Sequence, residues 1–223
     1  MSSEAQLLYA AACGNTAAVQ TLLRQGVHAD VRDGRGRTPL MLAAHGCFSE
    51  TVRVLLAAGA DCLAENKGNR PLIDYVHTAD VARMVLAAVP QQQQGRVATR
   101  LLFQYGVPVQ CLQVAVGYGA QVNARNKRGD TPLHIHAYSG SEECVQYLLA
   151  AGALPDLKNC HGKTPLYVAI SLAYADVACH LISAGADTHT TNAKGRTLMD
   201  LINACNCSAC KECAAVLKAA ENR

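Results

Sequence analysis

A short motif that begins Thr-Pro-Leu recurs along this chain and limits its fold more than any other feature. Copies start at Thr131 and Thr164, a related Thr-Leu-Met-Asp starts at Thr197, and each step is 33 residues. An earlier copy starts at Thr38. A fixed period of this length indicates a repeat protein, in which one supersecondary unit stacks on the next.

Glycines that follow apolar, helix-like segments keep the same phase. Gly26 and Gly59 are 33 residues apart, and the same step separates Gly119, Gly152 and Gly185. The step from Gly59 to Gly119 is 60 residues, which is six short of two periods. We therefore expect two shortened or irregular units in the middle of the chain.

The most complete unit contains Thr131-Pro-Leu-His-Ile-His-Ala137, then Gly140, then Cys144-Val-Gln-Tyr-Leu-Leu149 and Gly152. It resembles the ankyrin-repeat family, whose 33-residue unit contains T-P-L-H-x-A, a β-turn and two helices. The resemblance implies an all-α ankyrin-repeat solenoid. About six to seven helix-turn-helix units with short β-turn fingers would then form a single domain, with the middle units irregular.

The resemblance covers one domain over residues 5–220, divided into units of unequal quality. The units are expected at 5–32, 33–65, 66–90, 96–125, 126–158, 159–191 and 192–220. Between two of them, residues 90–95 read Pro-Gln-Gln-Gln-Gln-Gly, and none of these side chains suits a core. We expect a flexible polar surface loop there, with a hinge or a partner-specific loop as the functional alternative.

The Thr-Pro pair has a physical role at the start of a helix. The hydroxyl can cap free backbone amides, and proline fixes φ at a position that needs no amide hydrogen. The first helices should therefore start at Thr38, Thr131 and Thr164. In the third unit, Asn69-Arg-Pro71 replaces the threonine, and we expect a poorly capped helix.

Composition agrees with helices and excludes several partners. The chain is 50% hydrophobic and has no Trp and two Phe, which suits closely packed helices. A net charge of +3 gives no case for nucleic acid or a membrane surface. No signal peptide or membrane-spanning stretch is evident, so we expect a protein of the cytoplasm, with the nucleus as an alternative, monomeric on its own. The 11 cysteines should be free thiols.

The resemblance implies a function in protein–protein interaction, as an adaptor or regulatory scaffold that binds a partner through its concave face and fingers. A basic bias along the fingers suggests an acidic partner segment. The basic positions are Arg35, Arg37, Lys67, Arg128, Lys163, Lys194 and Arg196. The predicted partner-binding residues are Arg35, Arg37, His45, Lys127, Arg128, Asp130, Tyr138, His161, Lys163 and Ser171.

Enzymatic motifs are missing from the sequence. It contains no phosphate-binding loop, nucleophile elbow, H-E-x-x-H helix or dinucleotide fingerprint, so we expect no catalytic residue and no cofactor. His134 occupies the histidine of T-P-L-H, where the resemblance implies that the imidazole ties neighbouring turns together.

A cysteine cluster near the carboxyl end supports the main alternative. Cys205, Cys207, Cys210 and Cys213 lie within nine residues and could ligate zinc or respond to redox state. Core packing is the preferred interpretation, because one helix cannot fold back into a tetrahedral site. Two further alternatives are a spacer and a substrate-recruiting subunit of a ligase or kinase complex. The second would need an effector motif, and the tail 218–223 contains none that we find.

Overall fold

A computed structural model of the chain describes residues 2–204 and 208–221. Within them, thirteen α-helices and one 3₁₀ helix form the regular structure, and β pairing is limited to isolated bridges at Glu65–Pro71 and Thr191–Thr197. The predicted all-α fold is confirmed. In chain order the helices are α1 (Ser3–Ala12), α2 (Thr16–Arg24), α3 (Pro39–His45), α4 (Ser49–Ala57), η1 (Leu72–Tyr75), α5 (Ala79–Ala88), α6 (Gln91–Leu101), α7 (Val109–Gly117), α8 (Pro132–Ser139), α9 (Glu142–Ala150), α10 (Pro165–Ser171), α11 (Ala175–Ser183), α12 (Leu198–Ala204) and α13 (Ser208–Glu221).

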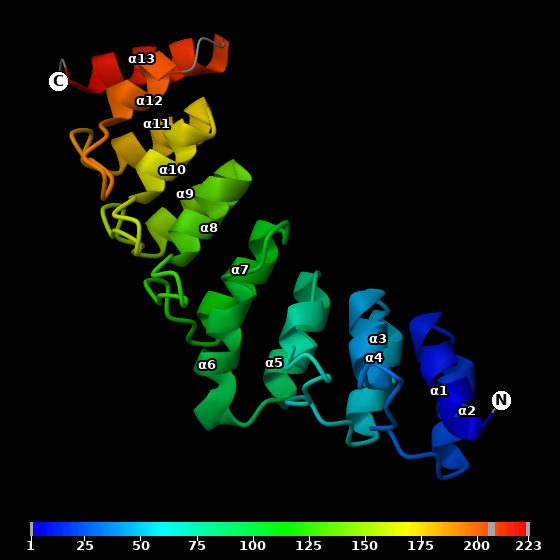
Figure 1. The fold of residues 1–223 in the computed structure, drawn as a ribbon. Helices are drawn as coiled ribbons and strands as arrows, with labels where there is room; N and C mark the ends of the chain where they lie inside the picture. Colours follow the sequence, from blue (N-terminus) through cyan, green and yellow to red (C-terminus); the bar gives the residue numbers. More distant parts are fainter. Residues whose placement is uncertain (1, 205–207, 222–223) are drawn as a thin grey trace. The chain divides into compact units, whose positions relative to one another are not determined.

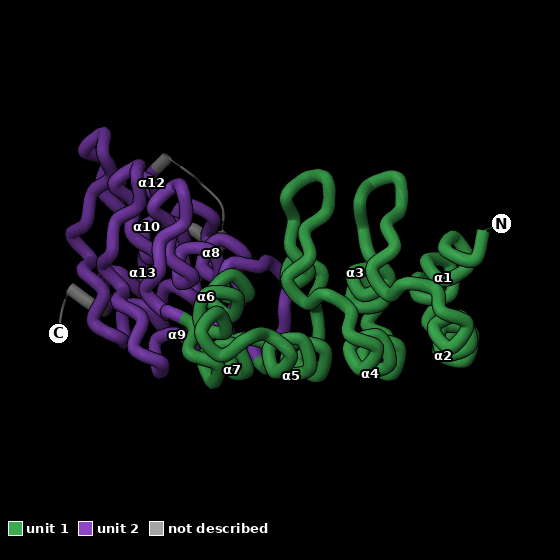
Figure 2. Tube along the Cα trace, turned by 90° about the horizontal axis from the view of Figure 1, so that it is seen from below, with its two compact units in different colours: residues 1–102, 110–120 green, residues 103–109, 121–223 purple. Residues whose placement is uncertain are grey.

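The helices belong to two compact units. Unit 1 comprises residues 1–102 and 110–120, and unit 2 comprises residues 103–109 and 121–223 (Figure 2). In unit 1 the pairs α1/α2 and α3/α4 lie side by side in chain order (Figure 1). The short η1 packs against α3 and α6, and α5 packs against α4 and α6. In unit 2 the pairs α8/α9, α10/α11 and α12/α13 also lie side by side. Each unit is therefore a stack of helix hairpins.

The Thr-Pro motifs start helices as predicted. The hydroxyl of Thr38 accepts from the amide of Met41, and that of Thr164 accepts from the amide of Tyr167. Thr131 forms a capping box with the side chain of His134. In each case proline occupies the first turn, where no amide hydrogen is needed.

The third repeat, expected at residues 66–90, starts its first helix without a side-chain cap, which confirms the prediction. Pro71 offers no side-chain hydrogen bond, and the helix that follows is a single 3₁₀ turn, Leu72–Tyr75. The backbone is already extended at Val76 and remains so at Thr78, directly before α5. Without a cap, the sequence forms one short turn in place of a full helix.

The polar loop predicted at residues 90–95 is wrong. Helix α6 begins at Gln91, directly after Pro90, and extends to Leu101. Glutamine is a good helix former, and the end of this segment buries Ala98 and Leu101. A helix whose first turns are polar is therefore stabilised by the apolar face of its later turns.

Two contacts explain how the polar tract fits the fold. The side-chain amide of Gln94 donates to the carbonyl oxygens of Leu86 and Val89, at 3.2 and 3.1 Å, and so caps the end of α5. Gly95 lies against Gly119, where a Cβ would come within 2.8 Å of the carbonyl oxygen. A glutamine and a glycine are thus used where a loop was expected.

The second helices carry the buried apolar stripe of each repeat. Val52 and Leu55 in α4 are fully buried, as are Val145 and Leu148 in α9. One helix pair cannot cover such a stripe alone, so it packs against the next pair. None of the described helices is both long and apolar enough to cross a membrane.

Candidate functional site

β-Turn fingers of one recurring construction occupy residues 33–37, 66–70, 126–130, 159–163 and 192–196. In the first, the amide of Asp33 donates to the carbonyl oxygen of Arg37 at 3.0 Å, and that of Gly36 donates to Asp33 at 2.9 Å. The same pair of bonds closes the fingers that begin at Asn66, Asn126 and Asn159. Each finger is thus a rigid hairpin turn.

An Asp or Asn side chain holds each turn from inside. One carboxylate oxygen of Asp33 accepts from the amides of Arg35 and Arg37, at 2.9 and 2.8 Å. Asn159 makes the matching pair of bonds to His161 and Lys163. These residues were not identified from the sequence, although they recur with the same spacing as the glycines that follow the helix-like segments. The full set is Asp33, Asn66, Asn126, Asn159 and Asn192.

Neighbouring fingers are bonded to each other within each unit. In unit 1 the amide of Lys67 donates to the carbonyl oxygen of Arg35 at 3.1 Å, and Figure 2 shows the two fingers projecting side by side. In unit 2 the amide of Cys160 donates to Arg128, and that of Ala193 donates to His161, both at 3.0 Å. These bonds fix the spacing of the finger tips.

The finger tips carry exposed basic side chains. Two acidic side chains of the fingers are already engaged: Asp33 forms an ion pair with Arg37 at 2.7 Å, and Asp130 accepts from the side-chain amide of Asn159 at 2.7 Å. Burial alone would raise the pKa of Asp33, but hydrogen bonds from Arg37 and Arg35 lower it below its ordinary value. The exposed basic tip residues are Arg35, Lys67, Lys127, Arg128, Lys194 and Arg196.

The predicted partner-binding residues lie in two groups. Unit 1 holds Arg35, Arg37 and His45, and unit 2 holds the others. Seven of the ten are exposed. The exposed residues are Arg35, His45, Lys127, Arg128, Tyr138, His161 and Ser171.

Four of the predicted partner-binding residues make contacts within the fold. Arg37 and Asp130 make the bonds described above. The carbonyl oxygen of Lys163 accepts from His134, and its ammonium lies 5.6 Å from the ring centre of Tyr167. The hydroxyl of Ser171 donates to the carbonyl oxygen of Val168 at 2.8 Å. Substitution would remove the side-chain contacts of Arg37, Asp130 and Ser171, whereas the carbonyl contact of Lys163 belongs to the backbone and would remain.

His45 lies in a cluster that the sequence did not reveal. Its ring is 6.1 Å from that of Tyr75 and 5.6 Å from that of His77, both edge-on. Arg70 lies over the ring of Tyr75 at 5.1 Å. Burial lowers the pKa of His77, and the nearby His45 and Arg70 lower it further. The short η1 turn brings His77 beside His45.

Tyr138 also has an unforeseen neighbour. Its ring centre lies 6.0 Å from that of Tyr105, with the two ring planes at 68°. Both rings are more than half exposed. Tyr105 lies in the connection between α6 and α7, a part of the chain where the repeat pattern offered no register.

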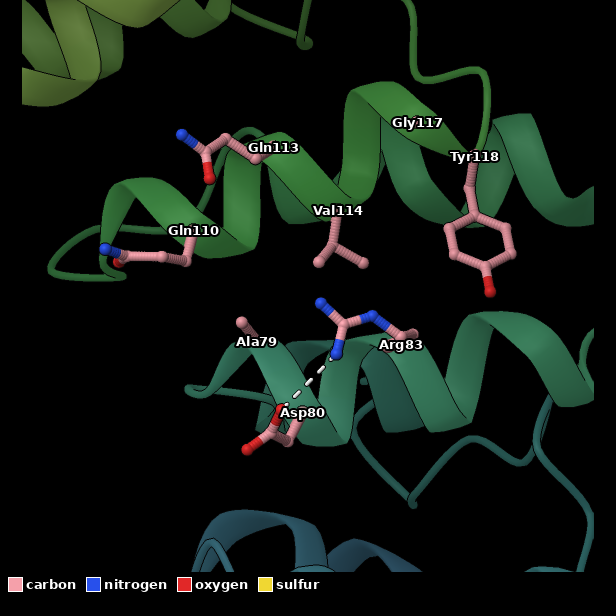
Figure 3. Close-up of a pocket in the computed structure, with 8 residues that line it drawn as sticks. All are labelled: Ala79, Asp80, Arg83, Gln110, Gln113, Val114, Gly117 and Tyr118. Carbon is pink, nitrogen blue, oxygen red and sulfur yellow. Dashed lines mark hydrogen bonds and ion pairs between the residues drawn. The ribbon is translucent and has the colours of Figure 1, made fainter.

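A groove of about 580 Å³ lies between α5 and α7 in unit 1 (Figure 3). Helices α4 and α5 pack together, and residues of α5 and α7 line the groove. Val114 faces the gap, and Arg83 lies across from it, 3.4 Å from the carboxylate of Asp80. Both members of this ion pair are well exposed, so the pair adds little stability. The groove lies in the irregular repeats in the middle of the chain.

The cysteine cluster is only partly visible. Cys205 and Cys207 lie outside the described residues, as does the side chain of Cys210. Cys213 is buried in α13. The zinc or redox hypothesis therefore stays a prediction.

Stacked helix hairpins joined by bonded β-turn fingers define a helical-repeat protein. The chain belongs to the ankyrin-repeat family, because the family model "Ankyrin repeats (3 copies)" matches residues 7–94 and 100–192. This confirms the resemblance noted in the sequence. Ankyrin repeats are a module for protein–protein interaction and not a catalytic family.

Solved ankyrin-repeat domains share the fold. The human ASB11 ankyrin repeat domain is 21% identical, with a TM-score of 0.81 over 94% of this chain and 96% of that one. The ankyrin repeat domain of Bcl-3, described as a unique member of the IkappaB protein family, is 22% identical, with a TM-score of 0.71 over 96% and 97%. At these identities the likeness concerns the fold alone.

Proposed function

We propose that this protein is an adaptor or regulatory scaffold that binds an acidic segment of a partner protein through its fingers and first helices. One observation carries the proposal. Exposed basic side chains stand at the finger tips, whereas Asp33 and Asp130 are held inside the fingers by hydrogen bonds. Basic side chains also outnumber acidic ones in the fingers, so the field at the tips is positive although the net charge of the chain is small.

The fingers are suited to binding because they are already ordered. Each turn is closed by backbone bonds, and neighbouring tips within a unit are bonded to each other. A preformed surface loses less conformational entropy on binding. Basic side chains on it would speed association with an acidic segment and make binding sensitive to salt.

We also propose that the protein acts as a monomer in the cytoplasm or nucleus. Cys13, Cys47 and Cys160 are exposed thiols. Such thiols stay reduced in these compartments.

Affinity capture tests the proposal. Wild-type protein and a variant with Arg35→Glu, Lys127→Glu and Arg128→Glu would be incubated with cell extract, and retained proteins identified by mass spectrometry. Arg37 is left unchanged because it pairs with Asp33 at 2.7 Å. We expect a partner rich in acidic segments that wild type retains and the variant loses.

Arg53→Glu is the matched control. Arg53 is exposed on α4 and pairs only loosely with Glu50, at 3.2 Å. It should retain the partner. Equal capture by wild type and the triple variant would refute the finger assignment. Stoichiometric zinc in reduced protein that captures nothing would favour the cysteine-cluster sensor instead.

A further inference from the structure

Two exposed tyrosines form a pair in unit 2. Tyr105 precedes α7 and Tyr138 lies near the end of α8, and their side chains are 56% and 57% exposed. The ring centres are 6.0 Å apart in an edge-on arrangement. Within the described residues, neither hydroxyl makes a hydrogen bond. The pair is thus an ordered aromatic surface with its polar groups available.

Three tyrosines elsewhere in the repeats are used by the fold. Tyr167 is buried, and its hydroxyl accepts from the side-chain amide of Asn192 at 2.8 Å. The hydroxyl of Tyr75 accepts from Asn66 at 2.7 Å. Tyr174 lies against Gly140, where a Cβ would come within 2.9 Å of its ring. The pair of Tyr105 and Tyr138 has no comparable structural duty.

The pair lies next to a finger with an exposed cation. The charges of Asp130 and Arg128 both act on the hydroxyl of Tyr105. Burial raises the pKa of Tyr105, Asp130 and Tyr138 raise it further, and Arg128 opposes them, so the hydroxyl stays protonated at neutral pH. Asp130 is already bonded to Asn159, whereas the side chain of Arg128 is exposed. Arg128 is therefore the exposed cation beside the pair that a carboxylate of a ligand can reach.

We propose that Tyr105 and Tyr138 anchor an aromatic side chain of the acidic segment that the fingers bind. This inference rests on the proposed function and specifies its ligand, an extended acidic peptide with an aromatic residue. An incoming ring can stack on the exposed faces of the two tyrosines, and Arg128 can pair with a neighbouring carboxylate. Tyrosine and arginine are among the residues that most often dominate binding energy at interfaces.

Peptide selection tests the inference on the full chain. A random peptide library displayed on phage would be selected against wild-type protein, and enriched peptides would be synthesised. We expect them to combine Asp or Glu with a Trp, Phe or Tyr. The protein has no Trp, so the emission of a peptide Trp would report its burial directly.

The variants Tyr105→Ser and Tyr138→Ser should each weaken these peptides about tenfold or more. Tyr9→Ser is the matched control, because Tyr9 is 66% exposed on α1, and it should leave the dissociation constant unchanged. Arg128→Glu should weaken binding and reduce its dependence on salt. Circular dichroism would verify that each variant is folded.

The outcomes separate the inference from the proposed function. Acidic peptides that lack aromatic residues, or that bind both serine variants as tightly as wild type, would overturn the anchor and leave the finger proposal standing. Aromatic peptides that bind Arg128→Glu and wild type equally, without salt dependence, would overturn both. A selection that enriches no peptide at all would also count against both.

Discussion

The imidazole of His134 donates its Nε2 hydrogen to the carbonyl oxygen of Lys163, 2.9 Å away in the next finger. Its other nitrogen, Nδ1, accepts from the amide of Thr131 at 3.2 Å and lies 2.8 Å from the threonine hydroxyl. One buried side chain therefore joins the cap of α8 to the finger that precedes α10. The role that the family resemblance implied for His134 is confirmed.

Replacing His134 with Gln should destabilise unit 2. Gln is too short to reach both partners, and a buried carbonyl or amide left without its partner costs about 1–3 kcal/mol. Urea unfolding would measure the loss. Gln substituted for the exposed His161 is the control and should cost little stability. Similar losses of stability in both variants would contradict the bridging role of His134.

Acid should weaken the same contact. Burial lowers the pKa of His134, although its bond to Lys163 opposes the shift. Free imidazole titrates near pH ~6.5. As the pH falls through that value towards the lower folded pKa, the unfolded chain binds the proton first, so stability present at neutral pH is lost. Protonation would also place a hydrogen on Nδ1, facing the Thr131 amide.

Unfolding midpoints between about pH 7 and about pH 5 would test this dependence. His134→Gln should flatten it. The pKa of His77 is lowered as well, by burial and by its neighbours, so His77→Gln should remove a separate part of the pH dependence of stability. An unchanged slope in His134→Gln would mean that the proton is taken up elsewhere.

Leu148→Ala should cost about 2–5 kcal/mol, because it leaves a cavity in a close-packed core. Leu148 is fully buried on α9, which packs against α8 and α11. The loss should therefore also loosen the neighbouring repeat. Thermal unfolding of Leu154→Ala provides the comparison, since Leu154 is 53% exposed. Equal melting temperatures for the two variants would be inconsistent with this packing.

Gly95→Ala tests the helix that replaced the expected loop. Alanine is the better helix former, yet its Cβ would lie 2.8 Å from the carbonyl oxygen of Gly119. Forcing that backbone apart should cost about 1–3 kcal/mol. Gly117→Ala is the matched control, because its Cβ would meet nothing within 4 Å, and it should be neutral or stabilising. A stabilised Gly95→Ala would show that α6 does not pack as described.

Asn159→Asp should destabilise its finger, whereas Asn192→Asp should be tolerated. Both changes keep the oxygen that accepts from the turn amides. At 159, however, the amide that donates to Asp130 at 2.7 Å would become a second carboxylate. Such a contact should cost about 1–3 kcal/mol. At 192 the partner is the hydroxyl of Tyr167, which can donate to a carboxylate. Urea unfolding at neutral pH compares them, and equal costs would contradict the assignment.

The sequence by itself determined the repeat, the helix starts and the weak third unit. Thr38, Thr131 and Thr164 cap their helices, and Pro71 leaves η1 uncapped. These features depend on contacts within a few residues, and the 33-residue period exposes them wherever they recur. Local chemistry of this kind can be predicted without knowledge of the rest of the chain.

Only the tertiary structure decided what distant residues do for one another. The tract that starts at Pro90 looks like a loop in the sequence, because the contacts that stabilise its helix are made with α5 and with Gly119 and are not visible in the tract itself. Tyr105 becomes part of a surface because the fold brings Tyr138 to it. The roles of these residues depend on which distant residues pack against them. Where the repeat loses its period, the spacing of residues along the chain does not predict those contacts.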